Sequence, residues 1–163
     1  MQRITCELKF GLRHYWKSHF LRELPDDAID LTINHFLSRE PQLSGSVLIE
    51  PFHGAARRVP LQDTAWNERS ARYNATCLSI WDDPANDDAQ IAWARTYAAS
   101  IQPWWTAGGG GYLNYSSPDE LPDRVKAAFG EAKYARLQEV KLRWDPLNRF
   151  RFNKNVLPAV RSL

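Results

Sequence analysis

The stretch ARYNATCLSIW, residues 71–81, is long enough to form a central strand of a β-sheet. Because side chains alternate between the two faces of a strand, one face would carry Tyr73, Ala75, Cys77, Ser79 and Trp81. Upstream, residues 46–50 and residues 55–59 predict two further strands, and the turn sequence PFHG lies between them. That arrangement is typical of a β-hairpin. Residues 4–10 predict an N-terminal strand, and residues 15–21 form either an aromatic loop or a short strand.

Three segments have the features of helices. The first begins at Pro25, which suits a first helical turn, and its predicted apolar face consists of Ile29, Ile33, Phe36 and Leu37. The second covers residues 87–101, where Asp87 and Gln90 have the spacing of a capping box. Its predicted buried stripe consists of Ile91, Ala94, Ala98 and Ile101. The third covers residues 131–144 and would direct inward Tyr134, Leu137, Val140 and Trp144.

Short hairpin connections favour an antiparallel sheet. The predicted fold class is therefore α+β, an antiparallel sheet with helices packed on one face.

The composition indicates a soluble globular domain, with 44% hydrophobic and 25% charged residues and a formal net charge of +2. Without a basic block, we expect no nucleic-acid partner. Cys6, Cys77 and the four histidines show neither a disulfide framework nor the spacing of metal ligands, so no metal site is expected. We find neither an apolar run long enough for a membrane span nor a signal peptide, so we expect a cytoplasmic location and no membrane partner.

Aromatic residues suggest where a ligand would bind. The seven tryptophans suit either core packing or a cleft for a flat ligand.

A glycine run, residues 108–111, lies between a helix and a predicted strand, which is the wrong order for a phosphate loop. It is better explained as a tight turn where the backbone passes close to another group, with a ligand as one candidate.

The sequence YLNY, residues 112–115, follows that turn. A tyrosine with its ordinary pKa of about 10 becomes a usable base only where positive charge or hydrogen bonding lowers that pKa. In a regular strand Tyr112 and Tyr115 point to opposite faces, so they share a site only if the backbone is irregular there. Glu50, at the end of a predicted strand, either orients a substrate or is simply exposed.

The C-terminal residues carry a family resemblance. The runs FGEAKYARL (residues 129–137) and DPLNRFRFNKNVLP (residues 145–158) resemble the terminal signature of FAD-linked oxidases of the berberine-bridge-enzyme-like family. The sequence YLNY resembles the family's Tyr-x-Asn-Tyr motif, and TAWNER (residues 64–69) resembles its Thr-Ala-Phe-x-x-Arg segment. His53 stands for the usual first glycine of a Gly-Gly-Ala motif, and Trp66 for the usual phenylalanine. The resemblance covers nearly the whole chain.

The resemblance implies a role for each matching residue. Tyr115 matches the general base that takes a proton from the substrate while a hydride goes to the flavin. Tyr112, Glu50 and Trp66 would contact a small-molecule substrate. The positions that would lie near FAD are Asn114, Asn153 and Asn155.

The resemblance also implies two parts of the chain. Residues 1–128 would form a partial substrate-binding domain, incomplete relative to the full family fold. Residues 129–163 would form a helix and tail that pack on a FAD domain. Nothing here matches that domain, so the expected partner is an N-terminal FAD-binding half, and FAD binding by this chain alone is expected to be weak or absent.

The expected function is that of the C-terminal portion of a flavin-dependent oxidoreductase, with O₂ as acceptor. The alternatives are a non-catalytic ligand-binding or interaction module and an inactive truncated remnant. An uncovered sheet edge and helix face would also permit a homodimer.

Overall fold

The computed structural model describes residues 11–41, 43–108, 110–117, 119–120, 122–152 and 154–160. Its sheet has three antiparallel strands in the order β1-β3-β2: β1 is Arg13–Leu21, β2 is Gly45–Pro51 and β3 is Tyr73–Trp81. The stretch quoted first is thus the central strand, as predicted. Residues 15–21 are a strand, and the predicted strand at residues 4–10 lies outside the described residues.

The predicted hairpin is wrong in its second strand. Residues Ala55–Arg58 form the short helix α2, and β2 pairs with β3 instead. Gly54 adopts a φ of 61°, a left-handed conformation that turns the chain away from the sheet after Pro51. Alanine and arginine are good helix formers, whereas β3 offers β2 a longer apolar partner.

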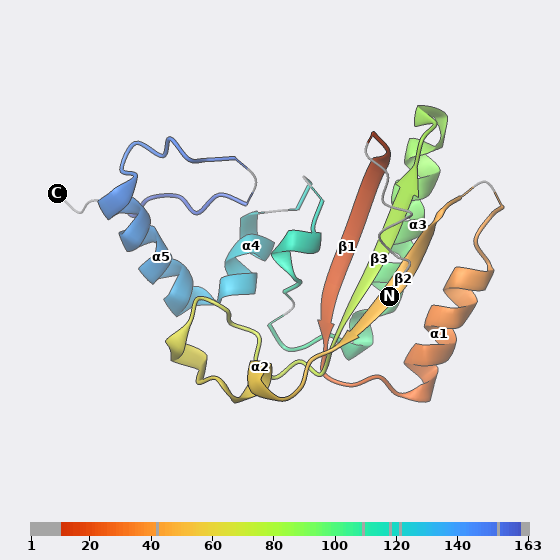
Figure 1. The fold of residues 1–163 in the computed structure, drawn as a ribbon, viewed down its shortest axis with the longest axis horizontal. Helices are drawn as coiled ribbons and strands as arrows, with labels where there is room; N and C mark the ends of the chain where they lie inside the picture. The colour runs from red at the N-terminus through yellow and green to blue at the C-terminus, as the bar shows by residue number, and fades with distance from the viewer. Residues whose placement is uncertain are drawn as a thin grey trace.

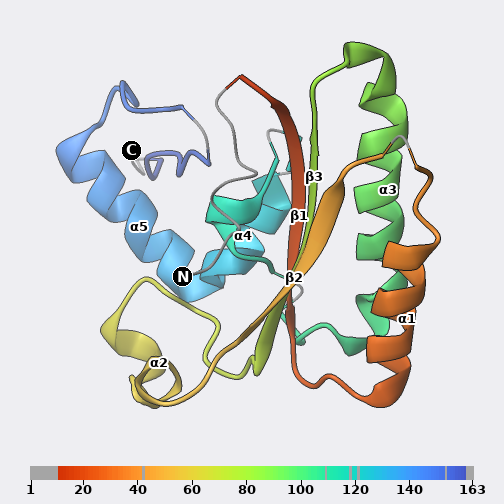
Figure 2. The same cartoon turned by 45° about the vertical axis from the view of Figure 1, so that its right-hand side comes forward.

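Two helices cover one face of the sheet, as expected for this α+β fold: α1, Asp26–Leu37, and α3, Asp87–Ser100 (Figure 2). Between them and the sheet lies the core, which includes Leu21, Ala28, Ala75, Cys77, Trp93, Ala94, Tyr97 and Ile101. The predicted face of the central strand is the face that packs on this core.

The apolar face predicted for α1 does not pack on the core, because Ile29, Ile33, Phe36 and Leu37 are all exposed. The helix is rotated so that its smaller side faces α3. Ala28 is fully buried, the Thr32 and Tyr97 hydroxyls are 3.1 Å apart, and the His35 ring stacks on Trp93. Polar and aromatic contacts to α3 therefore set the orientation of α1 more strongly than its apolar stripe does.

The capping box predicted at the start of α3 is also absent. The Asp87 carboxylate instead accepts hydrogen bonds from Arg13, at 2.5 and 2.6 Å, and from the Trp81 indole at 2.7 Å. It ties α3 to β1 and β3 rather than to its own first turn.

The other face of the sheet carries the C-terminal part of the chain (Figures 1 and 2). A 3₁₀ turn at Leu113–Tyr115, η5, stands where a strand was predicted. Helix α4, Pro122–Phe129, was not predicted, and α5, Glu131–Trp144, has the predicted bounds. Val140 and Trp144 of α5 are exposed rather than inward, and in the described ranges no regular element follows Trp144.

None of the helices in the described ranges combines the length and apolar character that membrane crossing requires.

Candidate functional site

A buried polar network occupies the sheet face opposite α1 and α3. The Ser18 hydroxyl of β1 donates to the Asn74 side-chain oxygen on β3 at 2.6 Å. The Asn74 amide donates to Glu50 on β2 at 2.9 Å and to the Thr76 hydroxyl at 3.0 Å. Asn74 and Thr76 are fully buried. Since each Asn74 side-chain group has a partner, the network holds the Glu50 carboxylate in a defined position.

The segment that precedes η5 is held tightly against β1. The Tyr112 backbone N–H donates to the Ser18 hydroxyl at 3.2 Å. A Cβ atom on Gly111 would lie only 2.0 Å from the Ser18 carbonyl oxygen. The glycine run is thus a place of close backbone approach, as predicted, and the neighbour is the backbone of β1.

The 3₁₀ turn brings the two tyrosines together. Tyr115 N–H donates to the Tyr112 carbonyl at 2.8 Å, and the ring centroids of Tyr112 and Tyr115 lie 4.9 Å apart at 80°. A regular strand would have placed these rings on opposite faces. The irregular backbone that a shared site requires is therefore present.

Tyr115 meets the polar network at Glu50. Its hydroxyl donates to the second Glu50 carboxylate oxygen at 3.5 Å, a long hydrogen bond. Burial, followed by the negative charge of Glu50, raises the pKa of Tyr115 above its ordinary value. Within the described ranges, no cationic side chain acts to lower that pKa. In this chain the phenol is therefore a proton donor to Glu50.

Trp66 is the centre of an aromatic cluster beside the tyrosines. Its ring lies 5.4 Å from Phe20, 6.0 Å from Phe52 and 5.5 Å from Tyr112, measured between centroids. The buried Lys133 amine of α5 donates to the Trp66 carbonyl at 2.6 Å. This bond fastens the loop that carries Trp66 to the C-terminal helix.

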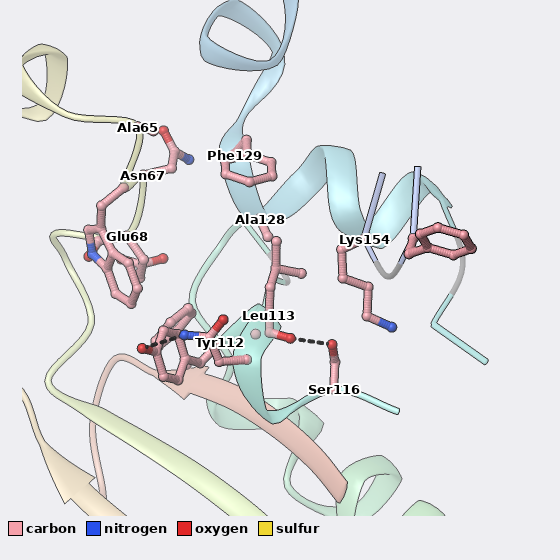
Figure 3. A pocket seen from close by; sticks show the side chains of 14 residues that line it. Ala65, Asn67, Glu68, Tyr112, Leu113, Ser116, Ala128, Phe129 and Lys154 are labelled. Atoms are coloured by element: carbon pink, nitrogen blue, oxygen red, sulfur yellow. Dashed lines mark hydrogen bonds between the residues drawn. The ribbon is translucent and has the colours of Figure 1, made fainter. Parts of the chain in front are cut away.

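Two cavities adjoin this cluster. The larger has a volume of about 880 Å³ and lies between the loop at residues 65–68, η5, the end of α4 and the tail (Figure 3). The smaller has a volume of about 460 Å³ and is lined in part by Glu50, Phe52 and Tyr115. Trp66, Glu68 and Tyr112 line both. The wall between the cavities therefore contains the two aromatic residues expected to contact a substrate.

The three asparagines expected near FAD have different surroundings. Asn114 lines the larger cavity, and its amide donates to the Tyr112 hydroxyl at 2.8 Å. Asn155 does not line that cavity, but its side-chain oxygen is buried and has no hydrogen-bond partner among the residues that the structure describes. Asn153 lies outside the described residues. Among the described residues of this group, Asn114 alone lines the larger cavity.

Sequence reasoning missed several residues of the site: Ser18, Phe20, Phe52, Asn74 and Lys154. Ser18 and Asn74 meet only because Phe20 pairs with Asn74 in the β1–β3 register, and no local motif marks that register. Lys154 lines the larger cavity, and its amine donates to the Ser117 carbonyl. The sequence signal that includes Lys154 is the run at residues 145–158 that carries the family resemblance. No cluster suited to a metal ion occurs in the part of the chain that the structure describes.

Comparison with known proteins confirms the family resemblance. Residues 111–157 match the family model described as berberine and berberine like. The chain is 31% identical to aclacinomycin-N/aclacinomycin-A oxidase of Streptomyces galilaeus, over 87% of this chain and 29% of that protein. It is 33% identical to the uncharacterized FAD-linked oxidoreductase YgaK of Bacillus subtilis, over 87% of this chain and 30% of that protein.

Solved structures of proteins with related names are also similar to this chain. The crystal structure of aclacinomycin oxidoreductase matches with a TM-score of 0.74 and 31% identity, over 90% of this chain and 33% of that one. The structure of BBE-like 28 from Arabidopsis thaliana matches with a TM-score of 0.79 at 20% identity, over 93% of this chain and 35% of that one, and shows a shared fold. The chain thus spans about 30% of the length of the curated relatives described above, and its fold is an incomplete version of theirs.

Proposed function

Since this chain is related to the C-terminal part of FAD-linked oxidases of the berberine-bridge-enzyme-like family, we propose that it is the substrate-binding portion of a flavin-dependent oxidase. Its substrate is a small organic molecule that binds beside Tyr115. The observation that carries the proposal is the contact of the Tyr115 hydroxyl with Glu50, at the edge of a cavity walled by Trp66 and Tyr112.

The polarity of the hydrogen bonds supports one direction of proton transfer, from Tyr115 to Glu50. Both the Asn74 amide and the Tyr115 hydroxyl donate to Glu50, so Glu50 acts as an acceptor on both oxygens. As Tyr115 takes a proton from the substrate hydroxyl, its own proton passes to Glu50. The 3.5 Å hydrogen bond suits such a relay once substrate binding shortens it. The Glu50 carboxylate is therefore the base that becomes protonated, and Tyr115 stays a neutral phenol before and after the transfer, so no phenolate with a raised pKa has to form.

The larger cavity is our candidate for the flavin ring. Bound FAD would supply the hydride acceptor, with O₂ as the final oxidant. Aromatic side chains and the Asn114 amide line a space of about 880 Å³, and Asn155 carries an unsatisfied oxygen. We assign Tyr112, Asn114 and Asn155 to the flavin side of the site, with Asn153 added from the family resemblance.

The C-terminal helix and tail are our candidate for the surface that packs on a FAD-binding half. Several large apolar side chains there are exposed: Val140, Trp144, Leu147, Phe150, Phe152, Leu157 and Val160. Soluble monomers rarely leave so many apolar side chains uncovered in one region. This surface supports the proposed division into a partial substrate-binding domain, residues 1–128, and a docking segment, residues 129–163.

The test is Tyr115→Phe in a preparation reconstituted with a FAD-binding half. We expect flavin reduction to slow about a hundredfold or more, as for loss of a general base. Glu50→Gln keeps the size of the side chain but cannot take up the proton, and is expected to slow the same step. Stopped-flow absorbance of the flavin measures the rate.

Tyr73→Phe is the matched control, because Tyr73 is a β3 tyrosine that packs against the core on the helix side of the sheet. An unchanged rate in Tyr115→Phe would remove Tyr115 from the mechanism.

A second candidate function, non-catalytic ligand binding, is favoured by the raised pKa of Tyr115. That function predicts substrate binding without any flavin reduction in the reconstituted wild type.

A further inference from the structure

We propose that the smaller cavity selects an aromatic substrate that carries an oxyanion, a carboxylate or a phosphate, and that Arg57 and Arg69 bind this group. The inference deepens the proposed function by naming the substrate class of the same site. Both arginines line the cavity of about 460 Å³, together with Glu50 and Tyr115. That volume is within the range of small-molecule sites, about 300–1,000 Å³.

The two guanidinium groups lack anionic partners. Among the described residues, no carboxylate lies within ion-pair distance of Arg57 or Arg69. Arg57, on α2, donates from its Nε to the Arg69 carbonyl at 3.5 Å, and no other side-chain hydrogen bond of Arg57 occurs within the described ranges. It is exposed and carries a full charge, so its guanidinium remains available to a ligand.

Arg69 is held in place but not neutralised. Its terminal nitrogens donate to the Ala56 carbonyl at 2.5 Å and to the Thr64 hydroxyl at 2.7 Å. Its Nε is buried and has no hydrogen-bond partner in the described part of the chain. A buried donor on a charged group is costly to leave unpaired, and an oxyanion would satisfy it.

The two carboxylates that line the cavity, Glu50 and Glu68, already accept hydrogen bonds from neighbouring neutral groups. One Glu68 oxygen accepts from the Ser70 N–H and hydroxyl and from the Ala71 N–H, at 2.6 to 2.9 Å. Glu50 accepts from Asn74 and Tyr115. The cavity therefore has a proton-accepting group at Tyr115 and Glu50, and unpaired positive charge on α2 and the loop that follows it.

Aromatic rings line the space between these groups. Phe52, Trp66, Tyr112 and Tyr115 all contribute to the lining, and their centroids are 4.9 to 6.0 Å apart along the chain of contacts. Such a wall favours a flat ring over an aliphatic chain. An aromatic substrate with its oxidisable carbon toward Tyr115 and its oxyanion toward the arginines matches the proton-accepting pair, the unpaired positive charge and the aromatic lining.

The experiment is isothermal titration calorimetry of the full 163-residue chain with three matched ligands: 2-naphthoate, 2-naphthyl phosphate and the neutral 2-naphthamide. We expect at least one anion to bind about tenfold more tightly than the amide, as for a charge-assisted hydrogen bond. The tighter anion distinguishes carboxylate from phosphate. Arg57→Gln should reduce the preference to near unity, whereas Arg58→Gln, an equal loss of charge outside the cavity lining, should retain it.

Arg69→Gln is a second variant, with circular dichroism to verify its fold because Arg69 also supports the loop. Equal binding of the anions and the amide by the wild type, or binding of none of them at millimolar concentration, would overturn the proposal. So would a preference that survives in Arg57→Gln. The assay contains no flavin and no turnover, so its failure leaves the oxidase proposal intact. Conversely, loss of the oxidase proposal by the Tyr115→Phe test leaves anion selectivity measurable.

Discussion

Glu50 shows how much of a residue's role depends on its neighbours. From sequence alone it was either a substrate-orienting group or an exposed carboxylate. Asn74 of β3 and Tyr115 of η5 both donate to it, which makes it an acceptor fixed on both oxygens. That role requires three segments that are distant in sequence, so no local pattern could have distinguished the alternatives.

His19 supports a pH-dependence prediction at the same scale. The side chain is 2% exposed on β1, stacks on Trp105 with centroids 4.1 Å apart, and accepts a hydrogen bond from Arg124 at its Nδ1. Burial, followed by the charges of Arg124 and Lys17, lowers its pKa from 6.5 to about 3. Between these pH values the unfolded chain binds the proton and the folded chain does not.

The contribution of neutral His19 to the free energy of unfolding should therefore be fully present above pH 6.5. It should fall by up to about 1.4 kcal/mol per pH unit as the pH drops towards 3. Urea unfolding at a series of pH values measures the slope. His19→Gln should flatten that slope, because its side chain does not titrate. An identical slope in the variant would show that other groups govern the acid sensitivity.

At the scale of elements, the position of η5 depends on one close backbone crossing. Gly111 passes so near β1 that a Cβ atom would overlap the Ser18 carbonyl, at 2.0 Å. The neighbouring Tyr112 N–H bonds to the Ser18 hydroxyl in the same crossing. The tyrosine pair is therefore positioned by the absence of a side chain at Gly111.

Gly111→Ala should destabilise the fold by about 1–3 kcal/mol, the typical cost of forcing atoms into a packed region, and displace η5 from β1. Gly108→Ala is the matched control from the same glycine run, because a Cβ there meets nothing within 4 Å. Urea unfolding gives the free-energy difference between the two variants. Equal stability of both would contradict the close approach at Gly111.

For the whole molecule, the distribution of apolar surface is uneven. The core between the sheet and helices α1 and α3 is well buried, whereas Trp144 and Phe150, near the C-terminus, are 74% and 82% exposed. The sheet face with the candidate site lies between these two regions (Figure 2). The candidate site can therefore be formed while the apolar surface beside it remains uncovered.

We expect the chain alone to retain FAD weakly or not at all. The glycine run in the described ranges precedes a 3₁₀ turn rather than a helix long enough to hold a phosphate. Gel filtration after incubation with excess FAD measures retention through the flavin absorbance of the protein peak. A stoichiometric yellow protein peak would contradict the expectation and show that residues 1–163 hold the cofactor unaided.

The sequence alone determined the central strand, the α+β class, the bounds of α5 and the family resemblance, because these depend on periodicity, terminating prolines and contiguous motifs. It misassigned residues 55–59 and the exposed face of α1, since turn geometry and the orientation of a helix on its neighbour are not local properties. The candidate site itself required the tertiary structure. Ser18, Glu50, Asn74 and Tyr115 come from β1, β2, β3 and η5, and only the strand register and the crossing at Gly111 bring their polar atoms within hydrogen-bonding distance.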